Sequence, residues 1–186
     1  METKQDIRVI KTKKSLYLGL LQLMKTKQFE EIKVSDICKI ALVNRSTFYD
    51  HFVDKYELLS SLIKDLEKKL ERKLDDIKNI NYKDYYTKII ELLLDHLEEN
   101  LLIYSSVIKN NNNSIAGDIF KDMILKNVDK HLKEKEQKID IPTTVISTFY
   151  VSAVINVCLL YVKEPTKYKK EVIIKSIKKL LPNDIY

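Results

Sequence analysis

The stretch that decides the fold is residues 34–55, VSDICKIALVNRSTFYDHFVDK. Its pattern predicts a short helix over 35–41, a tight turn over 42–44 and a second short helix over 45–52. Apolar side chains fall where two such helices must bury their inner faces, at Ile37, Ala41, Val43, Phe48 and Phe52. Polar and cationic side chains point outward, at Arg45, Ser46, Thr47, Tyr49 and His51. Such side chains at the start of a second helix suit a helix that enters a DNA groove N-terminus first, so the stretch predicts a DNA-reading helix-turn-helix.

The composition of the whole chain favours helices and a reducing compartment. Its 186 residues hold only two Gly and three Pro, which leaves little turn punctuation. The net charge of +6 is compatible with a polyanionic partner but is shared evenly between residues 1–60 and 61–186. Cys38 and Cys158 stand alone in apolar runs, as expected of core residues in a reducing cytosol. The N-terminus lacks an uninterrupted apolar segment, so we expect no signal peptide and a soluble, cytoplasmic protein.

Helical periodicity continues through the rest of the chain, and no segment alternates with period two, so the fold class is predicted to be all-α. We expect a first amphipathic helix over 10–24 and a long helix that starts near an N-cap at Asp54 and runs to Ile77. Further helices are expected over these ranges: 84–99, 101–109, 115–135, 142–162 and the segment between Pro165 and Pro182. The long helix separates a DNA-binding domain, 1–55, from a larger domain, 56–186.

Residues 145–162 are apolar nearly all the way round a helix, and such a helix must be covered on every side. Polar residues interrupt the run, and a Pro precedes it, which favours a buried helix over a membrane span. We therefore expect this helix and the last one to form a dimer interface with a second copy of the chain. The predicted interface residues are Phe149, Tyr150, Val151, Val154, Ile155, Cys158, Ile173, Ile177 and Leu180. The alternative is a core helix wholly inside one chain.

Residues 10–60 resemble the N-terminal domain of the TetR/AcrR family of transcriptional regulators. The resemblance rests above all on the string from Ser46 to Lys55, STFYDHFVDK, which is far more specific than a generic helix-turn-helix pattern. A weaker resemblance to a C-terminal domain of one branch of the family covers 142–186.

The resemblance implies a TetR-like homodimer of about nine helices per chain, with DNA contacts from helices one to three and dimerisation through helices eight and nine. The positions that meet phosphates and base edges in the family correspond to Lys33, Ser35, Asn44, Arg45, Ser46, Thr47, Tyr49, His51 and Lys55. Hydroxyl and cationic side chains suit phosphates, and Arg suits a guanine edge. Three departures are Leu42, where the family usually has Gly in the turn, Gln28, where it often has Gly before the aromatic residue, and Lys33, where it favours Thr or Ser as an N-cap.

We expect no enzymatic activity, cofactor or metal site, because no phosphate loop, catalytic arrangement or ligand cluster is evident. Tyr85, Tyr104 and Tyr150 are candidates to line an effector pocket, with ordinary packing as the alternative. The predicted function is that of a DNA-binding regulator, most simply a homodimeric repressor that binds a palindromic double-stranded operator and is released by an effector. Two alternatives stay open: control by a protein coregulator, with activation as the outcome, and a helical protein-interaction module without DNA.

Overall fold

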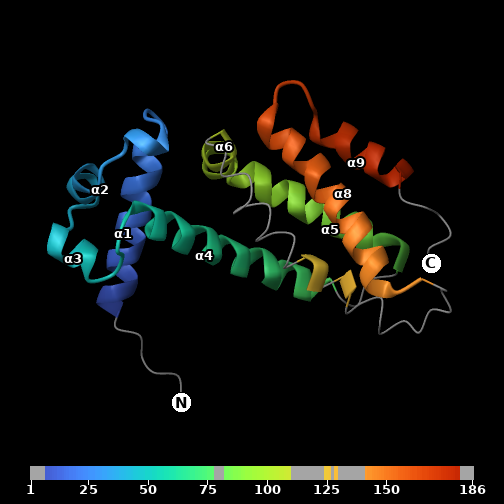
Figure 1. Cartoon of the computed structure of the whole chain (residues 1–186), viewed down its shortest axis with the longest axis horizontal. Helices are drawn as coiled ribbons and strands as arrows, with labels where there is room; N and C mark the ends of the chain where they lie inside the picture. Colours follow the sequence, from blue (N-terminus) through green and yellow to red (C-terminus); the bar gives the residue numbers. More distant parts are fainter. Residues whose placement is uncertain (1–6, 78–81, 110–123, 127, 130–140, 181–186) are drawn as a thin grey trace, which may run out of the picture. The chain divides into compact units, whose positions relative to one another are not determined.

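The computed structural model describes residues 7–77, 82–109, 124–126, 128–129 and 141–180, and every regular element in these ranges is a helix (Figure 1). The all-α prediction is confirmed. The chain divides into two compact units, Met1–Leu66 and Glu67–Tyr186, so the division falls inside the long helix expected to separate the domains. The helix predicted over 115–135 lies mostly outside the described residues.

The first unit contains α1 (Ile7–Met24), the short 3-10 helix η1 (Phe29–Glu31), α2 (Val34–Ala41), α3 (Arg45–Tyr49) and the start of α4 (Lys55–Asp76). Its core is made of apolar side chains that the periodicity places inward, among them Leu16, Leu20, Phe29, Ile32, Ile37, Phe48, Phe52 and Leu58. The hydroxyl of Tyr17 donates to the Asp65 carboxylate at 3.1 Å and lies 2.9 Å from the Ser61 hydroxyl, which fixes α1 against the first half of α4.

The turn between α2 and α3 contains a residue in the left-handed conformation that is not a glycine. Leu42 has φ 56° and ψ 40°, and it is the one described non-glycine residue with a positive φ. The Val43 N–H donates to the Cys38 carbonyl at 3.0 Å across this residue, which closes the C-terminus of α2. The turn expected over 42–44 therefore keeps the geometry for which glycine is the usual residue, at a conformational cost that Leu42 carries.

The N-terminus of α4 is closed by two reciprocal bonds. The Glu57 N–H donates to the Asp54 carboxylate at 2.8 Å, and the Val53 N–H donates to the Glu57 carboxylate at 2.6 Å. Asp54 is thus the cap that the sequence predicts, because its carboxylate satisfies an N–H that has no partner inside the helix.

The second unit contains the end of α4, α5 (Tyr82–Glu99), α6 (Leu101–Lys109), α8 (Thr143–Lys163) and α9 (Lys170–Leu180). Its core gathers Leu70 and Leu74 of α4, Ile89 and Leu93 of α5, and Val151, Ile155 and Cys158 of α8. Cys38 and Cys158 are both free and buried, as expected, and burial raises the pKa of the Cys158 thiol to about 12.

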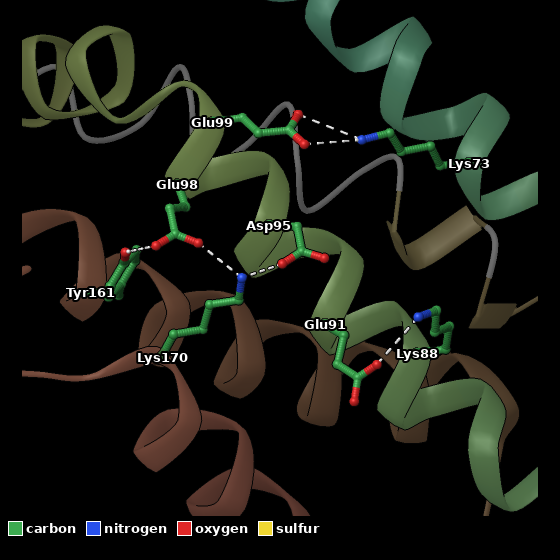
Figure 2. Close-up of polar contacts among 8 residues, drawn as sticks. All are labelled: Lys73, Lys88, Glu91, Asp95, Glu98, Glu99, Tyr161 and Lys170. Carbon is green, nitrogen blue, oxygen red and sulfur yellow. Dashed lines mark hydrogen bonds and ion pairs between the residues drawn. The ribbon is translucent and has the colours of Figure 1, made fainter.

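Acidic side chains of α5 form hydrogen bonds and ion pairs with α8 and α9 (Figure 2). Lys170, the first residue of α9, pairs with Asp95 and donates to the Glu98 carboxylate at 2.8 Å. The Tyr161 hydroxyl on α8 donates to the other Glu98 oxygen at 3.0 Å. Since Glu98 accepts from both helices, its pKa is lowered by the Lys170 and Tyr161 hydrogen bonds.

Candidate nucleic-acid interface

Two buried phenylalanines fix the helix-turn-helix on the core of the first unit. Phe48 in α3 and Phe52 just after it are buried, with ring centroids 5.9 Å apart and planes tilted at 53°. Phe52 also lies 6.5 Å from the Tyr17 ring of α1. The sequence predicts that both side chains lie on the inner face, and their burial confirms this. The opposite side of α3 is consequently turned to solvent.

The side chains predicted to read DNA lie on that solvent side, with one exception described below. Asn44, Arg45 and Ser46 are exposed, and Thr47 and His51 are half-buried. Tyr49 is 50% exposed, and its ring packs edge-on against Phe48 with centroids 5.4 Å apart. The Tyr49 ring therefore packs on the core while half of the side chain stays exposed.

Lys33 and Ser35 mark the start of α2, and both are exposed. Lys33 occupies the N-cap position and makes no side-chain capping bond, because an ammonium cannot accept from the N–H groups of the helix. Beside them, Asp36 pairs with Lys27 at 3.3 Å, and the Lys27 hydrogen bond lowers the pKa of the Asp36 carboxyl. This pairing offsets the single acidic side chain in the first turn of α2.

Lys55 is the exception, because its side chain is turned toward the protein. Its Nζ donates to the main-chain carbonyls of Phe29, Glu30 and Ile32 at 3.0, 2.8 and 3.0 Å. An ammonium has three protons, so none is left for a phosphate oxygen in this structure. The DNA contact of Lys55 stays a prediction, and in this structure the side chain is engaged with main-chain carbonyls of its own unit.

Lys13 of α1 lies near this surface, although the sequence reasoning did not single it out. Its Nζ lies 5.6 Å from the centroid of the Phe52 ring, and His51 packs on the same ring with centroids 6.4 Å apart. Lys13 thus places a cation near His51, just after the C-terminal end of α3. The signal that could have found it is its spacing from Tyr17, four residues on, which puts both side chains on one face of α1.

The residues of the predicted dimer interface fall into two groups, one buried within the protomer and one at least partly exposed. Five of its residues are buried within the unit itself and are assigned to the protomer core: Val151, Ile155, Cys158, Ile173 and Ile177. Phe149 and Leu180 are 67% and 74% exposed, and Tyr150 and Val154 are half-buried. The reason is geometric, because a helix that is apolar all round packs one face on α5, α6 and α9 and leaves the other open.

The open face of α8 is nevertheless apolar. Residues at helical spacing of three and four along it are exposed: Val145, Phe149, Ala153, Asn156 and Leu160. By length and composition, Thr143–Lys163 could also cross a membrane, although a core helix of a soluble protein passes the same test. The exposed apolar surface indicates a face that another macromolecule or a bilayer covers.

The three tyrosines proposed for an effector pocket are placed in separate surroundings. Tyr104 is fully buried, and its hydroxyl lies 2.8 Å from His96 Nε2. Tyr85 is buried beside Tyr86, with ring centroids 5.3 Å apart. Tyr150 packs edge-on against Phe149, at 5.1 Å between centroids.

Comparisons with known proteins agree with this geometry. The sequence model of "Bacterial regulatory proteins, tetR family" matches residues 19–62, and that of "Transcriptional regulator C-terminal region" matches 84–183. The dhaKLM operon transcriptional activator DhaS of Lactococcus lactis is 31% identical over 96 residues, which are 52% of this chain and 48% of that protein. The chain spans less than half the length of the curated relatives it matches.

Solved structures share the fold over nearly the whole chain. A TetR-family regulator from Syntrophomonas wolfei superposes with a TM-score of 0.72 at 19% identity, over 91% of this chain and 92% of that one. A TetR regulator from Streptococcus agalactiae superposes with a TM-score of 0.67 at 25% identity, over 95% of this chain and 96% of that one.

Proposed function

Because the chain belongs to the TetR family of bacterial transcriptional regulators, we propose that it is a cytoplasmic repressor that binds a palindromic operator as a homodimer and is released by an effector. The observation that carries the proposal is the solvent side of α3, where Asn44, Arg45 and Ser46 are exposed on a helix fixed by buried Phe48. A rigidly backed helix with free polar ends is what base readout in the major groove requires.

Arg45 is the residue we assign to direct base readout. A guanidinium can donate two parallel hydrogen bonds to the O6 and N7 atoms of guanine, which fixes a base identity rather than a backbone position. The hydroxyls of Ser46, Thr47 and Tyr49 and the ammonium of Lys33 are assigned to phosphates, because these groups position a protein on DNA without reading its sequence.

Two copies of α3 are needed for a palindromic site, and the open apolar face of α8 supports the pairing. Phe149 and Leu160 on α8 and Leu180 on α9 are exposed large apolar side chains in the segment that we assign to dimerisation. The two half-sites would lie about one helical turn of DNA, roughly 34–36 Å, or a small multiple of it apart. Effector binding to the C-terminal domain releases the operator only as far as the effector prefers a different spacing of the two DNA-binding heads.

The test begins with selection of bound duplexes from a random pool by the full-length protein. We expect a palindromic consensus, with Arg45→Ala weakening its binding by about 1–3 kcal/mol and relaxing preference at one base pair of each half-site. An equal loss on all sequences would instead assign Arg45 to phosphate. If a salt titration shows no binding to the selected or to random duplexes, the helical interaction-module hypothesis replaces this one.

An activator under a protein coregulator is a second candidate, and one observation favours it. The Lactococcus lactis relative, which is 31% identical over 96 residues, is named a transcriptional activator. The two mechanisms separate in a transcription assay on the selected operator, since a repressor lowers and an activator raises transcript yield from the promoter beside it.

A further inference from the structure

The Lys55 ammonium sits in a ring of main-chain carbonyls at the junction of η1 and α4. Its three bonds to Phe29, Glu30 and Ile32 are 2.8–3.0 Å long, and the side chain is only 14% exposed. An ammonium hydrogen-bonds through three donors and accepts nothing, so these carbonyls use its full capacity. A lysine in this environment behaves as an internal cross-link rather than as a surface charge.

Aromatic and acidic groups surround the same nitrogen. It lies 4.9 Å from the centroid of the Phe29 ring and 5.3 Å from that of Tyr56, distances at which a ring face attracts a cation. The two rings pack edge-on at 5.3 Å, and the Tyr56 hydroxyl donates to the Glu30 carboxylate at 2.6 Å. The Glu30 carboxylate is itself 3.9 Å from Lys55 Nζ, so charge and hydrogen bonds both hold the lysine in place.

These contacts lie beside the start of α2, which carries residues that we assign to DNA binding. Ile32, which supplies the third carbonyl, lies two residues before Val34, where α2 begins. Lys33 lies between them, and the N–H groups of Asp36 and Ile37 donate to its carbonyl. Lys55 is the first residue of α4, so its bonds join the start of the DNA-facing α2 directly to the start of α4.

We propose that Lys55 is a positioning residue for operator binding, which locks the start of α2 to the first turn of α4 and contacts no phosphate itself. The inference rests on the proposed DNA-binding function. A phosphate contact and an internal lock predict different salt dependences, because only a residue that neutralises a phosphate releases a counterion on binding.

The experiment compares full-length wild type with Lys55→Met, Lys55→Arg and the control Lys33→Met. Affinities for the selected operator and for a random duplex are measured from 50 to about 300 mM salt. For Lys55→Met we expect roughly tenfold weaker operator binding at every salt concentration, an unchanged salt slope and little change on random duplex. For Lys33→Met we expect weaker binding to both duplexes and a salt slope smaller by about 0.9 per lost phosphate contact.

Lys55→Arg provides the sharpest comparison. The planar guanidinium keeps the charge that a phosphate needs but directs its donors within one plane, so it does not replace an ammonium among three converging carbonyls. We expect it to bind the operator nearly as weakly as Lys55→Met. Wild-type affinity for Lys55→Arg, or a reduced salt slope for Lys55→Met, overturns the proposal.

Folding is followed by circular dichroism and thermal unfolding of each variant, so that a general loss of structure is recognised. A lowered unfolding temperature with an unchanged ratio of operator to random affinity would show a merely structural role and overturn the inference. Should Lys55→Met not fold, Lys55→Arg provides the decision, because it keeps the positive charge but cannot make the three converging bonds. It must then lower the operator-to-random ratio at constant salt slope, and an unchanged ratio rejects the lock. Wild type that binds no duplex refutes the proposed function itself.

Discussion

The Nε2 atom of His96 lies 2.8 Å from the hydroxyl oxygen of Tyr104, in a buried hydrogen bond that joins α5 to α6. Burial lowers the pKa of His96 from 6.5 to about 4 and raises that of Tyr104. Both groups therefore stay neutral at pH 7, which is the state in which one can donate and the other accept.

The second unit should consequently lose stability in mild acid. Below pH 6.5 the unfolded chain takes up a proton at His96 that the folded chain refuses until about pH 4, so the free energy of unfolding falls through this window. The loss attributable to His96 is at most on the order of 3 kcal/mol, at about 1.4 kcal/mol per pKa unit. Urea unfolding at several pH values measures it. His96→Gln should lower stability at pH 7 yet flatten the decline between pH 6.5 and 4, and an equally steep decline in this variant would rule out His96 as the cause.

Gly19 sets the closeness of α1 and α2. A Cβ added at Gly19 would lie 3.0 Å from the Ile37 carbonyl oxygen and 3.2 Å from both the Ala41 Cβ and the Ala41 N. Two of these atoms are main chain, so α2 must move to admit a methyl group. We expect Gly19→Ala to destabilise the protein by about 1–2 kcal/mol, since overpacking outweighs the roughly 1 kcal/mol gained in helix propensity. Gly19→Ala combined with Ala41→Gly removes one of the crowded atoms and should recover part of the loss in thermal unfolding.

Leu42 predicts a stabilising substitution. Its left-handed conformation, at φ 56°, costs a non-glycine residue about 1–2 kcal/mol, and its side chain is 92% exposed, so it contributes little packing. Leu42→Gly should remove that cost against about 0.5–1 kcal/mol of added chain entropy in the unfolded state, for a net gain near 0.5–1 kcal/mol. Leu42→Ala keeps a Cβ and should show no such gain in denaturant titration. A gain of equal size in Leu42→Ala would refute conformational strain as the reason.

The N-terminal unit was largely predictable because its signals are local. The spacing of Ile37, Phe48 and Phe52 gave the buried faces, and the exposed polar set on α3 followed as its complement. Asp54 could be expected to cap α4 because a capping carboxylate acts within one turn. A tight turn over 42–44 could be expected from the flanking helix pattern, but the left-handed conformation of Leu42 could not, since the family's usual glycine is absent there.

Lys55 and the α8 interface show where local signals end. The carbonyls that hold Lys55 come from 23 to 26 residues earlier in the chain, and main-chain atoms leave no trace in the identity of the residues that carry them. The helix Thr143–Lys163 is apolar on all sides, so its pattern of apolar and polar residues does not indicate which face points inward. Only packing on α5, α6 and α9 selects Val151 and Ile155 for the core.

The proposed dimer can be tested with two substitutions by Asp on α8, one at an exposed position and one at a buried position, which should have different effects. Phe149 is exposed, so Phe149→Asp should leave the protomer's stability within about 0.5 kcal/mol, yet weaken dimerisation by roughly 2 kcal/mol or more because it places a charge at the centre of an apolar interface. Ile155 is buried in the protomer, so Ile155→Asp buries an unpaired carboxylate and should destabilise the fold itself by several kcal/mol. Light scattering over a dilution series, with circular dichroism at each concentration, separates the two effects. A Phe149→Asp protein that keeps wild-type dimerisation would place the interface elsewhere, whereas folded monomers would assign it to the open face of α8.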